Sequence, residues 1–130
     1  MTTPAIDTAF YRDNGYVVVR DVYEAREIDA VMAVIYRLYR KFAPDDADLD
    51  GLDRPWESAA FDAKLIALRA ADPRVFGALY DCAQASAELS RFVLAPKVCA
   101  VAGACLGAPS EELSYSGIML RLDAPHDRRN

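Results

Sequence analysis

An acidic stretch in the first half of the chain has residue types and a spacing that suit a calcium loop. Asp46, Asp48 and Asp50 stand at every second position, Gly51 comes next, and Glu57 stands at the twelfth position counted from Asp46. An EF-hand loop uses carboxylates in this order, with a glycine at its sixth position and a glutamate at its twelfth. Calcium binding by these four carboxylates is therefore one hypothesis.

The residues just before Glu57 favour a simpler interpretation. Pro55 and Trp56 lie where the second helix of an EF-hand should begin, and no second loop follows to complete the usual pair. We therefore expect residues 45–57 to form a solvated acidic surface loop, with calcium binding as the alternative. Trp56 is the only tryptophan, and we expect it to plug the core rather than to face a substrate.

Metal chemistry of other kinds is limited by a single histidine, His126. One histidine cannot build a two-histidine-one-carboxylate iron site or a three-histidine zinc site within this chain. The cysteines Cys82, Cys99 and Cys105 form no C-x-x-C pair, and their spacing to His126 matches no zinc module. We expect reduced, buried cysteines, a cytoplasmic protein, a solvated turn histidine and no metal ligands in the chain.

The composition indicates one modest globular unit. The chain has 130 residues, of which 53% are hydrophobic and 27% are charged, and its net charge is −5. This charge repels phosphate backbones and anionic lipid, so we expect no nucleic-acid partner and no membrane partner. The sequence shows no signal peptide, and no apolar run approaches the roughly 18 residues of a membrane span. Residues 1–130 are expected to form a single domain or a fragment.

Hydrophobic spacing predicts the elements that hold these residues. Residues 6–14 are predicted to form a short helix that Gly15 ends, residues 16–19 a buried strand, and residues 24–42 an amphipathic helix. Four further helices are predicted after the acidic loop, because helix-starting residues precede each apolar pattern: Ser58, Asp72 with Pro73, Ser86, and Pro96.

The hydrophobic period changes to two near the end of the chain. Residues 113–122 predict a strand with two largely apolar faces. One face carries Leu113, Tyr115, Gly117, Met119 and Arg121, and the other carries Ser114, Ser116, Ile118, Leu120 and Leu122. Two strands are marginal alone, so the predicted sheet needs cover from the helices or further strands from elsewhere.

Two segments in this order resemble a known family. They are F-Y-R-D-N-G-Y-V-V-V-R-D-V at residues 10–22 and S-G-I-M-L-R-L-D-A-P-H-D-R-R-N at residues 116–130. The chain resembles the N-terminal portion of the phytanoyl-CoA dioxygenase family of Fe(II)/2-oxoglutarate-dependent oxygenases. The resemblance implies an α+β, mostly helical chain: N-terminal helices plus the first strands of a double-stranded β-helix, with residues 113–122 as its first core strand.

The same resemblance implies where a pocket would be and what is missing from it. In that family an iron-binding H-x-D follows such a strand and turn, and a second histidine and a 2-oxoglutarate-binding arginine come later. Here His126 is directly followed by Asp127, so the H-x-D is absent. The resemblance implies that Tyr115, Gly117, Met119 and Arg121 form part of a pocket wall, where a guanidinium suits a carboxylate. An edge arginine paired with an acidic side chain is the alternative for Arg121.

Two functional hypotheses follow. The first is the N-terminal portion of an oxygenase that hydroxylates or otherwise oxidises a small organic substrate, with Fe(II) and 2-oxoglutarate as cofactors of the complete family member and neither expected to bind this chain alone. The second is a non-catalytic helical protein-interaction module. An exposed strand at residues 113–122 would recruit other strands, so we expect association through it under the first hypothesis.

Overall fold

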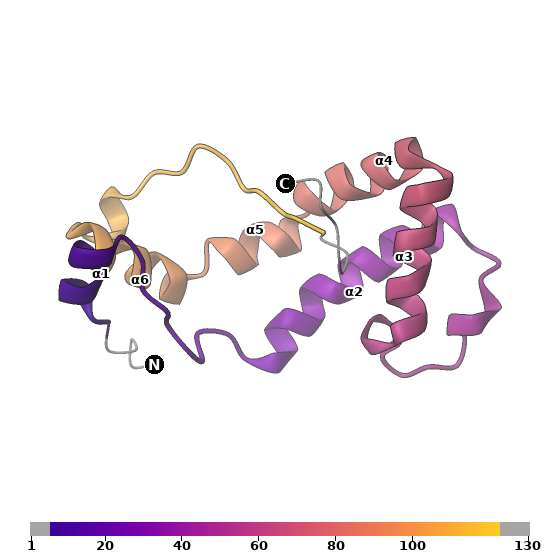
Figure 1. Ribbon diagram of the computed structural model, residues 1–130, viewed down its shortest axis with the longest axis horizontal. Helices are drawn as coiled ribbons and strands as arrows, with labels where there is room; N and C mark the ends of the chain where they lie inside the picture. Colours follow the sequence, from indigo (N-terminus) through magenta and orange to yellow (C-terminus); the bar gives the residue numbers. More distant parts are fainter. Residues whose placement is uncertain (1–5, 123–130) are drawn as a thin grey trace.

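The structure is a computed structural model that describes residues 6–122, and these residues form an elongated assembly of helices (Figure 1). Their α-helices are α1 (Thr8–Asn14), α2 (Ala25–Phe42), α3 (Ala59–Ala71), α4 (Pro73–Gln84), α5 (Ala87–Val93) and α6 (Pro96–Leu106). Short 3₁₀ turns lie between or after them: η1 (Ala47–Leu49), η2 (Pro55–Glu57) and η3 (Ser110–Glu112).

The helices begin and end where the local sequence predicts. The side chains of Ser58, Asp72 and Ser86 accept hydrogen bonds from backbone N–H groups in the first turns of α3, α4 and α5. Gly15 follows α1 with a φ of 79°, and Gly107 follows α6 with a φ of 69°, the left-handed conformation that glycine adopts most easily. The four helices predicted after the acidic loop are therefore confirmed.

The core lies around α2, the longest helix. Its buried residues Ile35 and Tyr39 join the fully buried Phe61 of α3 and Leu79 of α4 in one cluster. The rings of Tyr39 and Phe61 meet edge to face, with centroids 5.6 Å apart. Burying a large apolar side chain of this kind contributes roughly 1.5–3 kcal/mol, so these residues supply much of the stability of the helical assembly.

Helix α6 is joined to the rest of the chain by a polar and aromatic contact. Lys97 at the start of α6 pairs with Glu27 of α2 and lies 5.0 Å from the centre of the Tyr23 ring. Tyr23 stacks on Phe92 of α5, with ring centroids 3.8 Å apart, and its hydroxyl donates to the Phe92 carbonyl at 2.9 Å. These contacts fix α6 and α1, which packs against it, at one end of the molecule (Figure 1).

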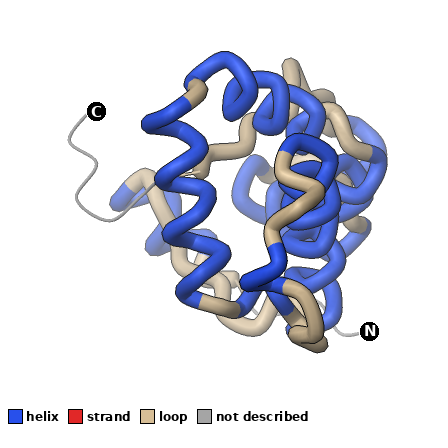
Figure 2. Tube along the Cα trace, turned by 90° about the vertical axis from the view of Figure 1, so that its right-hand side faces the viewer, coloured by secondary structure: helices blue, strands red, loops and turns tan. Residues whose placement is uncertain are grey.

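The two predicted strands are wrong for the described residues: helices and loops make up residues 6–122, with no strand among them (Figure 2). Residues 16–19 form a loop, and Tyr16 and Val18 are exposed rather than buried. Residues 113–122 run as a long open segment with a bend at Ser116 (Figure 1). A strand needs a neighbouring strand to accept its backbone hydrogen bonds, and neither segment lies beside one within this part of the chain.

Two further expectations concern the surface. All three cysteines are free, but Cys82 is exposed and Cys99 and Cys105 are only half-buried, so the prediction of buried cysteines is wrong. In residues 6–122 no single helix is long and apolar enough to cross a membrane. Helices α5 and α6 reach that length and composition only as a pair bent by 42°.

Candidate functional site

The extended segment of residues 113–122 is where the sequence predicts a pocket wall. Its even-numbered residues Ile118, Leu120 and Leu122 are half-buried, and the last two pack against the core cluster. The predicted wall residues Tyr115, Gly117, Met119 and Arg121 all face outward, with Tyr115 64% and Met119 83% exposed. The alternation of period two is thus present in residues 117–122, whereas residues 114–116 are all exposed, and the four predicted wall residues are all exposed.

Two side chains of α4 hold this segment in place. The Tyr80 hydroxyl donates a hydrogen bond to the Leu120 carbonyl, and the Leu120 N–H donates to the Gln84 Oε1 at 3.3 Å. Both backbone polar groups of Leu120 are therefore satisfied by side chains. The segment keeps its extended shape at this point without a partner strand.

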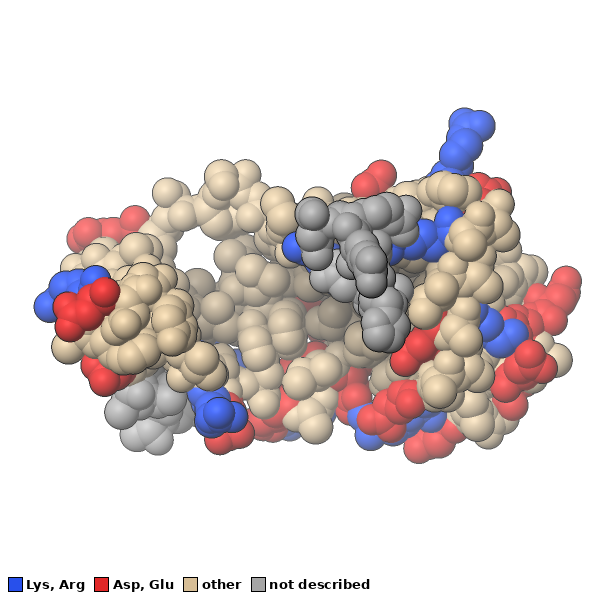
Figure 3. Space-filling model, in the orientation of Figure 1, with Lys and Arg blue, Asp and Glu red and all other residues tan. Residues whose placement is uncertain are grey.

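The backbone of the first part of the segment has no hydrogen-bond partner among the described residues. From residue 114 to residue 119 no backbone group takes part in a hydrogen bond to another described residue. Figure 3 shows an opening between this stretch and the helices below it. Unpaired N–H and C=O groups along an extended chain can accept another strand, so this stretch is an open edge.

Most residues of the acidic loop are exposed, as the surface-loop interpretation predicts, and its carboxylates pair with cations of the chain. Lys64 of α3 pairs with Asp46 at 2.6 Å and with Asp48 at 3.0 Å, and Arg40 of α2 pairs with Asp50 at 2.7 Å. Basic and acidic side chains intermingle at this end of the molecule (Figure 3). The fourth predicted calcium ligand, Glu57, pairs with Arg54 at 3.0 Å. Every carboxylate of the calcium hypothesis already faces a cation of the chain.

The loop also has a buried side chain, because Leu49 is only 1% exposed and belongs to the core. Beside it, Tyr39 donates a hydrogen bond to Asp46 at 2.5 Å. Burial and this bond raise the pKa of Tyr39 to about 12. The hydrogen bonds from Lys64 and Tyr39 hold the pKa of Asp46 below its ordinary value. The loop thus covers part of the core and is held by ionic contacts.

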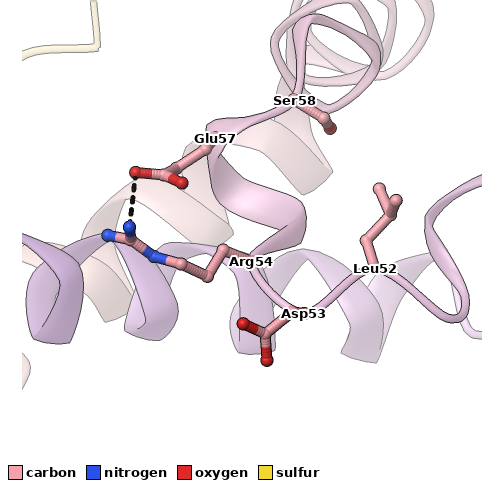
Figure 4. A pocket seen from close by; sticks show the side chains of 5 residues that line it. All are labelled: Leu52, Asp53, Arg54, Glu57 and Ser58. Carbon is pink, nitrogen blue, oxygen red and sulfur yellow. Dashed lines mark ion pairs between the residues drawn. The ribbon is translucent and has the colours of Figure 1, made fainter.

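A shallow depression lies along the second half of this loop (Figure 4). It has a volume of about 420 Å³, opens widely to solvent and is lined by Leu52, Asp53, Arg54, Glu57 and Ser58. Arg54 is already engaged there by Glu57 and by Asp29 of α2. Trp56 lies beside it and packs against the core cluster, as the plug interpretation predicts. Because the Arg54 guanidinium is already paired with these two carboxylates, it is not free to bind a ligand in the depression.

The described residues do not fit an iron site. Residues 6–122 contain no histidine, and no three cysteine, aspartate or glutamate side chains among them gather closely enough to hold a metal ion. A non-haem Fe(II) site needs two histidines and a carboxylate on one face. His126 lies outside the described residues, as does the predicted stop of the strand at residues 123–125.

The anchors Tyr80 and Gln84 were not predicted from the sequence. They stand four residues apart on α4, so they share one face of the helix. Tyr80 and Gln84 directly follow the buried residues Leu79 and Ala83 and are themselves half-buried. Because polar groups that are taken out of water need hydrogen-bond partners, this pair indicates that a backbone segment lies against α4. That signal could have located the anchor but not the segment that it holds.

Comparison with known proteins identifies the family. No curated protein and no solved structure matches the chain. The family model described as phytanoyl-CoA dioxygenase (PhyH) matches residues 11–123, which is most of the chain and includes the end of α1, all of α2 to α6 and the extended segment. This chain belongs to the phytanoyl-CoA dioxygenase family.

Proposed function

We propose that residues 1–130 are the N-terminal, largely helical portion of an Fe(II)/2-oxoglutarate-dependent oxygenase that hydroxylates or otherwise oxidises a small organic substrate. The observation that carries the proposal is the family match over residues 11–123. The family suggests an oxidoreductase of the dioxygenase type. The same proposal includes a small organic substrate, a cytoplasmic location and association through residues 113–122.

The geometry of residues 113–122 supports this assignment. One face of the segment is docked on α4 and the core, and the other face is open. A first core strand needs this arrangement, because its inner face must look into a barrel while its outer face rests on the covering helices. In the proposal, Tyr115, Gly117, Met119 and Arg121 line that inner face, and further strands pair with the bare backbone of residues 114–119.

The iron must be held by residues other than those described. The family is generally dependent on Fe(II) and 2-oxoglutarate. Residues 6–122 do not offer the donors that such an iron needs, so we assign no step of the reaction to them. Their proposed role is to cover one side of the barrel and to shape the entrance for the substrate.

One observation favours the second candidate, a helical protein-interaction module without catalysis. Helices α3, α4 and α5 have side-chain caps, and α2, α3 and α4 share a buried core, as a self-sufficient module requires. This candidate predicts a cooperative fold, monomeric or dimeric, with no exposed sheet edge.

Turnover of 2-oxoglutarate separates the two candidates. It is measured with added Fe(II) on residues 1–130 and on the product of the complete reading frame that encodes them. The oxygenase proposal expects turnover by the complete product only, and the interaction module expects none from either. Binding of candidate partner proteins to residues 1–130 is the matching test of the second candidate.

A further inference from the structure

Residues 44–50 cross the space between α2 and α3 as a strap over one end of the core. We infer that this strap is a latched element: Arg40 and Lys64 hold it closed, and it opens locally, with the helices intact, when their charges are removed or screened. The inference does not depend on the proposed oxygenase function, because it concerns contacts within residues 6–122.

The latch consists of two cations that come from different helices. Lys64 of α3 binds the carboxylates of Asp46 and Asp48. Arg40 of α2 donates to the Asp46 carbonyl at 2.9 Å, to the Pro44 carbonyl at 2.8 Å and to Asp50 at 2.7 Å. Charge-assisted hydrogen bonds of this kind are the stronger ones, so the two side chains fasten the strap at both of its ends.

The remaining attachments are few. The Tyr39 hydroxyl donates to Asp46, and Leu49 inserts its side chain into the core. The backbone hydrogen bonds of the strap stay inside it, from the Ala47 N–H to the Asp45 carbonyl and from the Asp50 N–H to the Ala47 carbonyl. In the described part of the chain, opening the strap therefore breaks no backbone hydrogen bond of α2 or α3.

The ends of the strap and the packing of its neighbours suit a local motion. Gly51 follows it with a φ of 84°, and no atom lies within 4 Å of the place where a β-carbon would stand, so this joint can change conformation at little steric cost. Helices α2 and α3 are each packed against α4, independently of the strap. Local opening costs little free energy when it exposes little apolar surface. Opening of the strap exposes one large apolar side chain of the strap, Leu49.

Amide hydrogen exchange on the complete chain tests the latch. The reporting amides are Ala47 and Asp50, which are protected inside the strap, and the reference amides lie in the middle of α2 and α3. In Lys64→Gln we expect exchange at the two strap amides to rise at least about tenfold, with the helix amides unchanged. In the unmodified chain, raising the salt concentration should speed the same two amides because salt screens exposed charges.

The other lysines supply matched controls. Lys97→Gln removes an ion pair of α6 with α2 and leaves the strap contacts intact, and Lys41 is exposed on α2. Neither Lys97→Gln nor Lys41→Gln should alter the strap amides. Unchanged strap exchange in Lys64→Gln would overturn the latch, and equal acceleration of strap and helix amides would overturn the local opening. If Lys64→Gln does not fold, the salt series on the unmodified chain decides in the same way.

Discussion

The hydroxyl of Tyr80 on α4 donates a hydrogen bond to the backbone carbonyl of Leu120, forty residues further along the chain. This contact and the neighbouring one from Gln84 attach an extended segment to a helix through side chains instead of through a sheet. It explains how residues 118–122 can keep alternating inward and outward side chains without a partner strand. The same contact orients the proposed pocket wall away from the helices.

Removing the Tyr80 hydroxyl should loosen this attachment. For Tyr80→Phe we expect a loss of about 0.5–1.5 kcal/mol in the free energy of unfolding, because one hydrogen bond is lost and the Leu120 carbonyl is left without its protein donor. Urea unfolding measures the loss, and faster exchange of the Leu120 amide should accompany it. Tyr115→Phe is the control, since Tyr115 is 64% exposed on the same segment. Equal losses in the two variants would contradict the anchoring role.

Gly103 in α6 allows the chain to fold back after the helix. A β-carbon at this position would lie 2.6 Å from the Ala108 carbonyl oxygen, a backbone atom that cannot rotate away. We expect Gly103→Ala to lower the free energy of unfolding by about 1–3 kcal/mol, the usual cost of overpacking. Thermal unfolding of the purified variant measures this effect.

Gly77 in α4 is the matched control, because it is also a helical glycine but has no atom near the site of a β-carbon. Gly77→Ala should raise the free energy of unfolding by about 0.5–1 kcal/mol, since alanine loses less backbone entropy in a helix. Opposite signs for the two substitutions are expected. A stabilising Gly103→Ala would show that the turn after α6 differs from the one described.

The pairing of Asp46 predicts a specific acid sensitivity. Its folded pKa is lowered, first by Lys64 and then by Tyr39, so this carboxyl stabilises the fold above its unfolded pKa of about 3.9. The stabilisation is lost as the pH falls from that value through the lower folded pKa. Asp46→Asn should reduce the fall in stability between about pH 4 and pH 2. Urea unfolding across this range checks it, and an unchanged slope would contradict the pairing.

The sequence predicted the helices well because their signals are local. Ser58, Asp72 and Ser86 cap helices through bonds to backbone groups two or three residues away, and the left-handed glycines end α1 and α6. The period of two separates half-buried from exposed residues only in the second half of the segment, residues 117–122, because Leu113 is half-buried and both Ser114 and Ser116 are exposed.

What the sequence missed depends on contacts between distant residues. Whether an alternating segment becomes a strand depends on a neighbouring strand, and residues 113–122 instead meet Tyr80 and Gln84. The cations that pair with the acidic loop were not predicted either, because Lys64 and Arg40 come from helices on either side of it. Pairings of this kind have no local signature in the chain.

The central claim is that this chain contributes the helical cover and first core strand of a 2-oxoglutarate oxygenase and holds no iron by itself. The most direct measurement is Fe(II)-dependent conversion of 2-oxoglutarate to succinate, made in parallel on residues 1–130 and on the product of the complete reading frame. We predict no conversion by residues 1–130 and clear conversion by the complete product, with an H-x-D and a later histidine in its sequence. Conversion by residues 1–130 alone, or none by the complete product, would contradict the account.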